Sequence, residues 1–139
     1  VDRIDAKDTT LRIVDYKTGG SPKTPANIEQ LFTPSESRPN YIFQTFLYAA
    51  IMSRQQSLKV APSLLYIHRA ASESYSPVIE MGEPRQPKIP VSNFAFFEDE
   101  FREHLQRLLE EIFDKNEPFT QTEDTKKCAY CDFKAICKR

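Results

Sequence analysis

The pattern of apolar and polar positions predicts that the chain opens with a β-hairpin. Residues 1–6 and 11–16 are rich in aliphatic and β-branched side chains, and the polar stretch 7–10 separates them. The simplest connection is a two-residue turn centred on Asp8 and Thr9. A longer turn would shift every cross-strand pair, so the register is a hypothesis.

The rest of the chain alternates between helical and extended patterns. The expected elements are, in order, a loop at 19–40 with a helical turn at 26–32, a helix at 41–54, strands at 63–68 and 75–81, an irregular stretch at 82–90 and a helix at 94–115. Two apolar stripes are expected to face the core: Phe43, Phe46, Leu47, Ala50 and Ile51 in the first helix, and Phe97, Phe101, Leu105, Leu108, Leu109 and Ile112 in the second. This order predicts an α/β fold.

Composition and charge narrow the function classes. With 139 residues, the chain suits one domain that buries a sizeable core. A formal net charge of -1 argues against a freestanding basic nucleic-acid binder, but a nuclease needs acidic metal ligands and is not excluded. The sequence holds no signal peptide and no apolar run near the about 20 residues that span a bilayer. We expect a cytoplasmic protein without a membrane partner.

The predicted hairpin gathers three charged side chains on one face. With the two-residue turn, Asp2 lies opposite Asp15, and Lys17 shares the face of Asp15 because side chains alternate along a strand. Facing carboxylates are destabilising unless a cation sits between them or both point into water. On the opposite face, Asp5 lies across from Arg12, where we expect an ion pair.

These residues resemble the motifs of a known family. Asp15-Tyr16-Lys17, within IVDYKTG, resembles the D-x-K core motif of the PD-(D/E)XK nuclease superfamily, and VDRID resembles its upstream aspartate motif. Gln44 to Tyr48 reads Q-T-F-L-Y, similar to the Q-x-x-x-Y motif of the RecB/AddB-type branch. Residues four apart lie on one helical face, so the amide and the phenol are expected to act together. The ordered set covers most of the chain.

The resemblance implies a metal-dependent hydrolase of DNA. It implies that Asp2, Asp15 and the carbonyl of Tyr16 hold Mg²⁺ or Mn²⁺, that Lys17 is the catalytic lysine, and that Gln44 and Tyr48 present an amide and a phenol to the nucleic-acid strand or to the lysine. Magnesium prefers hard oxygen ligands and keeps several waters, which this set allows. It would polarise the scissile phosphate and lower the pKa of a bound water.

The resemblance also implies the fold and its division. We expect a restriction-endonuclease-like core, a mixed β-sheet flanked by helices, incomplete on its N-terminal side because related enzymes carry further elements upstream. Residues 1–120 are expected to be the C-terminal portion of that nuclease core, and 121–139 a cysteine-bearing tail. We therefore expect the chain to be part of a larger protein.

All the cysteines lie in the tail, as Cys128, Cys131 and Cys137 in a C-x2-C-x5-C arrangement. An intracellular setting disfavours disulfides, so metal binding is the better interpretation, with iron, zinc or free thiols as alternatives. The spacing is similar to that in AddB-type and CRISPR-associated nucleases, where a fourth, upstream cysteine completes a 4Fe-4S cluster. The resemblance implies this cluster in the intact parent, and either an empty site or a disordered tail here. The nearby basic residues either contact DNA phosphates or are solvated: Lys126, Lys127, Lys134, Lys138 and Arg139.

The functional prediction is the exonuclease-like domain of a helicase-nuclease that acts in double-strand break repair and recombination, with DNA and a helicase subunit as partners. The alternative is a non-catalytic scaffold of the same fold that binds DNA or a partner. His68 and His104 have no visible partner in the sequence, so we expect them to be solvated or satisfied rather than catalytic.

Overall fold

The computed structural model describes residues 1–118 and 120–138. Contacts divide the chain into two units, Val1–Leu108 and Leu109–Arg139, which are described separately. The predicted division between 120 and 121 concerns the family core and its tail, and it stays a prediction. Among the described residues, no helix is long and apolar enough to cross a membrane.

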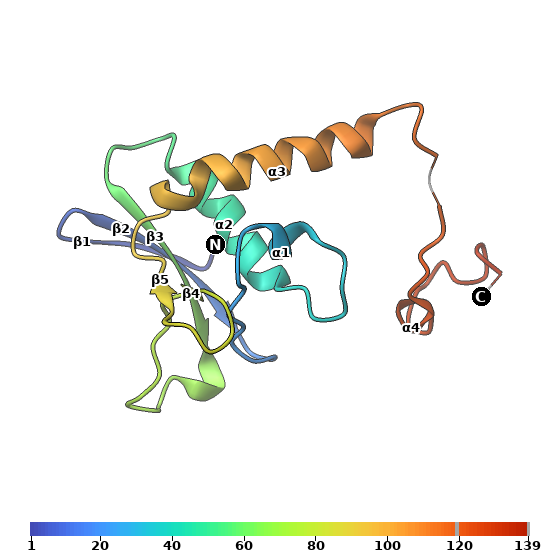
Figure 1. The fold of residues 1–139 in the computed structure, drawn as a ribbon. Coiled ribbons are helices and arrows are strands. Elements are labelled where there is room, and N and C mark those ends of the chain that lie inside the picture. The colour runs from blue at the N-terminus through green and yellow to red at the C-terminus, as the bar shows by residue number, and fades with distance from the viewer. Residues whose placement is uncertain (119, 139) are drawn as a thin grey trace. The chain divides into compact units, whose positions relative to one another are not determined.

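The centre of the first unit is a mixed sheet in the order β1-β2-β3 (Figure 1). Strand β1, Arg3–Lys7, pairs antiparallel with β2, Thr10–Lys17. Strand β3, Lys59–Tyr66, pairs parallel with β2, so β2 is the central strand. With the helices described next, this arrangement is the α/β, restriction-endonuclease-like fold that the sequence predicts.

The predicted hairpin register is confirmed for the pairs from Arg3 with Val14 to Lys7 with Thr10, whereas the expected pair of Asp2 with Asp15 lies beyond the ladder. Ile4 pairs with Ile13, and Asp5 pairs with Arg12. The pairing of Lys7 with Thr10 leaves a two-residue turn in which Asp8 has a φ of 54°. Asp is among the few non-glycine residues that tolerate this region, which explains why a turn without glycine still closes so tightly.

The parallel pair is joined by a crossover that contains two helices. Helix α1, Glu29–Phe32, corresponds to the predicted helical turn, and α2, Asn40–Met52, lies across the sheet (Figure 1). A short 3-10 helix, Ile67–Arg69, follows β3. The remaining elements are the two-stranded ribbon of β4, Glu80–Met81, and β5, Ile89–Pro90, the long helix α3, Ala95–Phe113, and α4, Thr125–Cys128.

Aromatic rings form the centre of the core. Phe46 of α2 and Phe101 of α3 are fully buried, with ring centroids 5.8 Å apart, and Phe94 lies 5.3 Å from Phe46. These contacts hold the start of α3 against α2, while Ile13 and Val60 of the sheet pack into the same core cluster. Helix α2 is therefore fixed between the sheet and α3.

The predicted strands after α2 were partly wrong. Instead of 63–68, β3 covers Lys59–Tyr66, and His68 belongs to the 3-10 helix. Of the predicted strand 75–81, only Glu80–Met81 is a strand, with an isolated bridge between Ser63 and Val78. Part of the stretch expected to be irregular forms β5. Pairing with β2 extends β3 through residues that propensity alone disfavours, because strand formation depends on neighbours.

The predicted apolar stripes were also partly wrong. Ile51, Leu109 and Ile112 are about half exposed, at 50%, 45% and 49%. In their place Ile42 and Ala49 of α2 are buried. The stripe of α2 is rotated because the helix contacts the sheet on one side and α3 on another.

The second unit is a tail with little regular structure. Asp124 caps α4 by accepting a hydrogen bond from the Lys126 amide at 3.2 Å. Cys128 and Cys131 are half-buried and their thiols are free. Their backbones are linked by a hydrogen bond from the Cys131 amide to the Cys128 carbonyl at 3.1 Å. Cys137 is also free, and its carbonyl accepts a hydrogen bond from Gln121 at 3.3 Å.

The aromatic core predicts a clear stability difference between two phenylalanines. Phe46→Ala removes a fully buried ring and is expected to lower the free energy of unfolding by about 3–5 kcal/mol. Phe96→Ala, at a ring that is 82% exposed, is the matched control and is expected to change it by less than about 0.5 kcal/mol. Urea unfolding followed by circular dichroism measures both, and equal losses would contradict the described core.

The Asp5 carboxylate predicts an acid-dependent loss of stability. The hydrogen bond from Arg12, at 2.6 Å, together with the charges of Arg12 and Arg3, holds the pKa of Asp5 below its ordinary value of about 3.9. Its stabilising effect is therefore complete above pH 4 and is lost as pH falls through the folded-state pKa. Asp5→Asn is expected to show a smaller drop in Tm between pH 5 and pH 3 than the unsubstituted protein, whereas Glu73→Gln, at an exposed loop position, is expected to keep the full drop.

Candidate active site

The candidate site lies at the carboxyl end of β2, on the face that α2 covers. Ile13, Asp15 and Lys17 alternate on this face, and Ile13 is fully buried in the core. Asp15 is only 4% exposed, although it carries a carboxylate. The apolar packing that secures β2 therefore also draws Asp15 away from solvent.

The charge of Asp15 is balanced by its neighbour on the strand. Lys17 Nζ and Asp15 Oδ2 form an ion pair, and both side chains are largely shielded from solvent. The contact does not have hydrogen-bond geometry, and Asp15 Oδ2 is a buried oxygen that accepts no hydrogen bond from the described residues. An isolated buried carboxylate is strongly unfavourable, and the ion pair with Lys17 compensates its charge although Oδ2 accepts no hydrogen bond.

Helix α2 holds the lysine from the other side. Lys17 Nζ donates a hydrogen bond to Gln44 Oε1 at 2.9 Å, and Gln44 Nε2 donates to the hydroxyl of Tyr48 at 2.9 Å. Gln44 and Tyr48 lie one helical turn apart, which is why their side chains meet. Asp15, Lys17, Gln44 and Tyr48 thus form one continuous polar chain from strand to helix.

Asp2 reaches the site through the backbone. Its Oδ2 accepts a hydrogen bond from the Tyr16 amide at 2.6 Å. The last pair of the β1–β2 ladder is Arg3 with Val14, so the carboxylate occupies the place where the next strand carbonyl would bind Tyr16. Asp2 is exposed and precedes β1. It therefore lies beside the Tyr16 backbone, the group whose carbonyl was predicted to bind metal.

The donor set is suited to a hard divalent cation. Asp15 Oδ2 contacts the Lys17 ammonium but accepts no hydrogen bond from the described residues, and such a carboxylate oxygen is the kind of group that magnesium binds. The Asp2 carboxylate and the Tyr16 carbonyl supply further oxygens. Throughout residues 1–118 and 120–138, no three His, Cys, Asp or Glu side chains gather closely enough to hold a metal. Nor do Cys128, Cys131 and Cys137 come together as a metal site. A magnesium site needs only one or two carboxylates from the protein, because the ion keeps several of its waters.

Sequence reasoning missed two tyrosines that shape the site. Lys17 Nζ lies over the ring of Tyr41, 4.3 Å from its centroid, and the Tyr41 ring is 6.5 Å from that of Tyr66. Burial, with smaller effects of Tyr75 and Tyr41, raises the pKa of Tyr66, so its phenol stays protonated. Positions 41, 44 and 48 share one helical face, and this spacing could have indicated Tyr41. Tyr66 comes close to the site only because β3 pairs in parallel with β2, which places Tyr66 opposite Lys17.

One glycine allows the loop after β2 to approach this ring. Gly20 has a φ of 78°, and a Cβ on it would lie 3.3 Å from Cε2 of Tyr41. Any other residue would be strained there and would press on the ring beneath Lys17. The sequence shows glycines here, but not the contact that requires one.

The histidines lie outside the polar chain. His104 is half-buried and its ring stacks on Phe32, with centroids 5.2 Å apart. His68 is exposed and meets the edge of Tyr66 at 6.0 Å. Both have aromatic neighbours that the sequence did not reveal.

Comparison with known families identifies the class to which the fold and site belong. A family model described as the PD-(D/E)XK nuclease superfamily matches residues 1–138. The chain therefore belongs to the PD-(D/E)XK nuclease superfamily, a class of nucleases that generally use divalent metals such as Mg²⁺. No curated protein and no solved structure gave a match.

The polar chain predicts that Gln44 positions Lys17. Gln44→Ala removes the acceptor that holds the ammonium, and we expect it to lower nuclease activity by about 10–100-fold, the range found when a group that orients a metal ligand is removed. Tyr48→Phe should lower the rate by a smaller factor, because Tyr48 is one hydrogen bond further from the lysine. The matched control is Gln55→Ala, at an exposed position beyond α2, which should retain full activity. Initial rates on labelled DNA give the comparison, and a Gln44→Ala rate equal to that of the control would contradict the assignment.

Proposed function

We propose that this chain is a metal-dependent deoxyribonuclease domain of the RecB/AddB type, which hydrolyses phosphodiester bonds within a helicase-nuclease that acts in double-strand break repair and recombination. The observation that carries the proposal is the chain of contacts from Asp15 through Lys17 to Gln44 and Tyr48. It joins the D-x-K motif to the Q-x-x-x-Y motif, which is the pairing expected of this branch.

Mg²⁺, or Mn²⁺ in its place, would be held by Asp2, Asp15 and the Tyr16 carbonyl. When bound, such an ion polarises the scissile phosphate and activates a water for attack. Asp15 contributes a buried carboxylate whose position is set by the packing of Ile13 and its neighbours on β2. A charge that is held in place before the substrate arrives needs little reorganisation during the reaction.

Lys17 would neutralise charge on the reacting phosphate. Its ammonium is held by Gln44 on one side and lies over the Tyr41 ring, so its position is restricted before DNA binds. Partial burial strengthens its interaction with an incoming anion, because water screens the charge less there. The phosphate would take over part of the contact that Asp15 now makes with the ammonium.

The partners and the second cofactor follow from the same branch assignment. A helicase subunit would supply unwound DNA, which is consistent with a chain whose own net charge is only -1. We propose that Cys128, Cys131 and Cys137 ligate a 4Fe-4S cluster in the intact parent. As the structure places them, the three thiols do not form a metal site, and a fourth ligand has to come from elsewhere.

A second candidate is a non-catalytic scaffold that binds DNA or a partner subunit. The observation that favours it is the hydrogen bond between the Asp2 carboxylate and the Tyr16 amide, which already uses one oxygen of the expected metal ligand. In a scaffold, this bond would serve only to close the end of the hairpin.

The deciding experiment is magnesium-dependent digestion of linear DNA. Asp15→Asn and Lys17→Ala are each expected to reduce the rate by about 10²-fold or more, since each removes a charge that stabilises the transition state. Lys7→Ala, at an exposed position of the same hairpin, is the matched control and should digest DNA normally. Chelation with EDTA should stop the reaction.

Two outcomes would contradict parts of the proposal. Equal digestion by all variants would reject the assigned residues. DNA binding without any magnesium-dependent digestion by the unsubstituted protein would favour the scaffold. Thermal unfolding of each variant separates loss of chemistry from loss of fold.

A further inference from the structure

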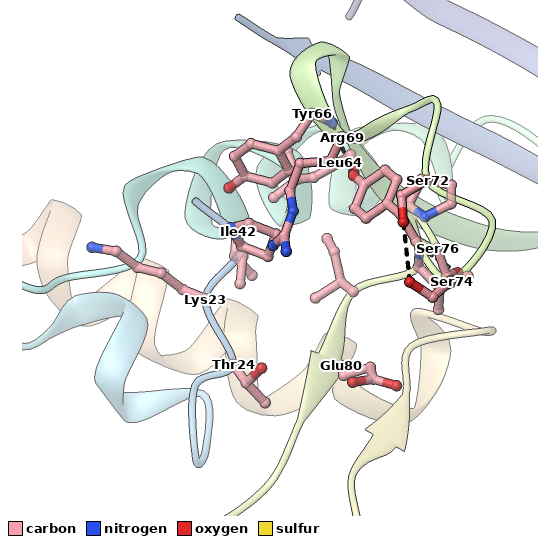
Figure 2. A pocket seen from close by; sticks show the side chains of 15 residues that line it. Lys23, Thr24, Ile42, Leu64, Tyr66, Arg69, Ser72, Ser74, Ser76 and Glu80 are labelled. Carbon is pink, nitrogen blue, oxygen red and sulfur yellow. Dashed lines mark hydrogen bonds between the residues drawn. The ribbon is translucent and has the colours of Figure 1, made fainter. Parts of the chain in front are cut away.

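A second polar feature lies next to the candidate site, at the carboxyl end of β3. A cavity of about 280 Å³ opens between the end of this strand, the segment 69–80 and residues 22–24 (Figure 2). Ile42, Leu64 and Tyr66 supply apolar walls, and several hydroxyl groups line the rim. Neither the D-x-K motif nor the Q-x-x-x-Y motif contributes a residue to this lining.

The wall of the cavity is fixed to the sheet by hydrogen bonds. The Tyr75 hydroxyl donates to the Leu64 carbonyl at 2.7 Å and accepts from the Tyr66 amide at 2.9 Å. The Leu64 amide in turn donates to the Pro77 carbonyl at 2.9 Å. The returning segment therefore pairs along the free edge of β3, so the rim is held in place rather than being a loose loop.

One cation of the lining has no partner among the residues that the structure describes. Figure 2 shows the Arg69 side chain running from the 3-10 helix into the cavity beside Ile42. Its guanidinium forms no hydrogen bond or ion pair with the described residues. Lys23 differs, because its ammonium donates to the carbonyls of Ser37 and Arg38 at 2.8 and 3.2 Å.

The lining suits a phosphate group. Ser72 and Ser74 lie with their hydroxyls 3.0 Å apart at the rim, and Thr24 and Ser76 add further hydroxyls. The planar guanidinium of an arginine binds phosphate through paired hydrogen bonds, and hydroxyl groups in the same cavity can add further donors. Glu80 is the acid among the described lining residues, and it lies across the cavity from Arg69 (Figure 2).

Tyr66 belongs to the cavity wall and is also a neighbour of the candidate site. Tyr66 pairs with Lys17 in the parallel register, and its ring meets that of Tyr41, over which the lysine lies. Adjacent strands are about 5 Å apart, and a 3-10 helix rises about 2 Å per residue. Arg69 is therefore on the order of 10 Å from Lys17, which corresponds to a few nucleotides at the axial rise of duplex DNA, about 3.4 Å per phosphate of one strand.

We propose that this cavity is a subsite for an internal phosphate of the DNA strand, with Arg69 as its anchoring residue, a few nucleotides from the phosphate that is cleaved. The proposal rests on the proposed function in taking DNA as the ligand. It assigns Arg69 to binding and positioning of the strand, whereas Asp15 and Lys17 serve the chemistry.

The test is a salt titration of DNA binding by the full chain in EDTA, where cleavage does not interfere. Fluorescence anisotropy of a single-stranded oligonucleotide labelled at its 3′ end gives Kd at several salt concentrations. Each neutralised phosphate contributes about 0.7 to the slope of log K against log salt for single strands. Arg69→Gln is expected to reduce the slope by about that amount and to weaken binding several-fold. Arg69→Lys should keep most of the slope, because the charge remains.

The matched control is Arg54→Gln, which makes the same charge change at an exposed position just beyond the end of α2, away from the cavity lining. It should keep the slope and affinity of the unsubstituted chain. An Arg69→Gln slope equal to that of this control would overturn the proposal, as would failure of the unsubstituted chain to bind DNA.

A second arm separates internal from terminal phosphates. Arg69→Gln should lower the affinity for an oligonucleotide with a 5′-phosphate and for one without it by the same factor. A loss confined to the 5′-phosphorylated strand would overturn the assignment to an internal phosphate. The cleavage assay tests the proposed function separately. If Asp15→Asn and Lys17→Ala digest DNA as fast as the unsubstituted chain while Arg69→Gln still weakens DNA binding, the proposed catalytic roles are rejected and the subsite is retained.

Discussion

The burial of one carboxylate beside one ammonium constrains the rest of this structure. Asp15 is almost completely shielded and Lys17 largely so, and neither charge would be tolerated there alone. The pair is stable because Gln44 satisfies the lysine from α2. The position of α2 over the sheet, and the aromatic contacts of Phe46 that keep it there, are therefore also requirements of the polar site.

The parallel pairing of β2 and β3 gives the site its surroundings. The carboxyl ends of parallel strands are where open α/β sheets usually bind ligands, because the chain leaves both strands at the same edge. Here that edge brings the D-x-K motif of β2 beside Tyr66, and the 3-10 helix then carries Arg69 into the neighbouring cavity. One geometric feature thus places the chemical groups and the proposed strand subsite side by side.

The hairpin was predictable and the first half of β3 was not, because the two differ in how far apart in the chain their interacting residues are. A two-residue turn sets the register of its own strands, so Asp5 meets Arg12 at 2.6 Å as expected. The beginning of β3, Lys59-Val60-Ala61-Pro62, looks like a loop in isolation. It becomes a strand only because β2 offers it a parallel partner from more than forty positions away in the chain.

The sequence by itself determined which residues could form the site, because Asp15 with Lys17 and Gln44 with Tyr48 are brought to one face by the local periods of strand and helix. Tertiary structure alone decided that these two pairs meet, that Tyr41 lies beneath the ammonium, and that Asp2 binds the Tyr16 amide. It also decided where Arg69 lies. The physical reason is that local periodicity depends on neighbouring residues, whereas the rotation of a helix over a sheet depends on the packing of the whole core.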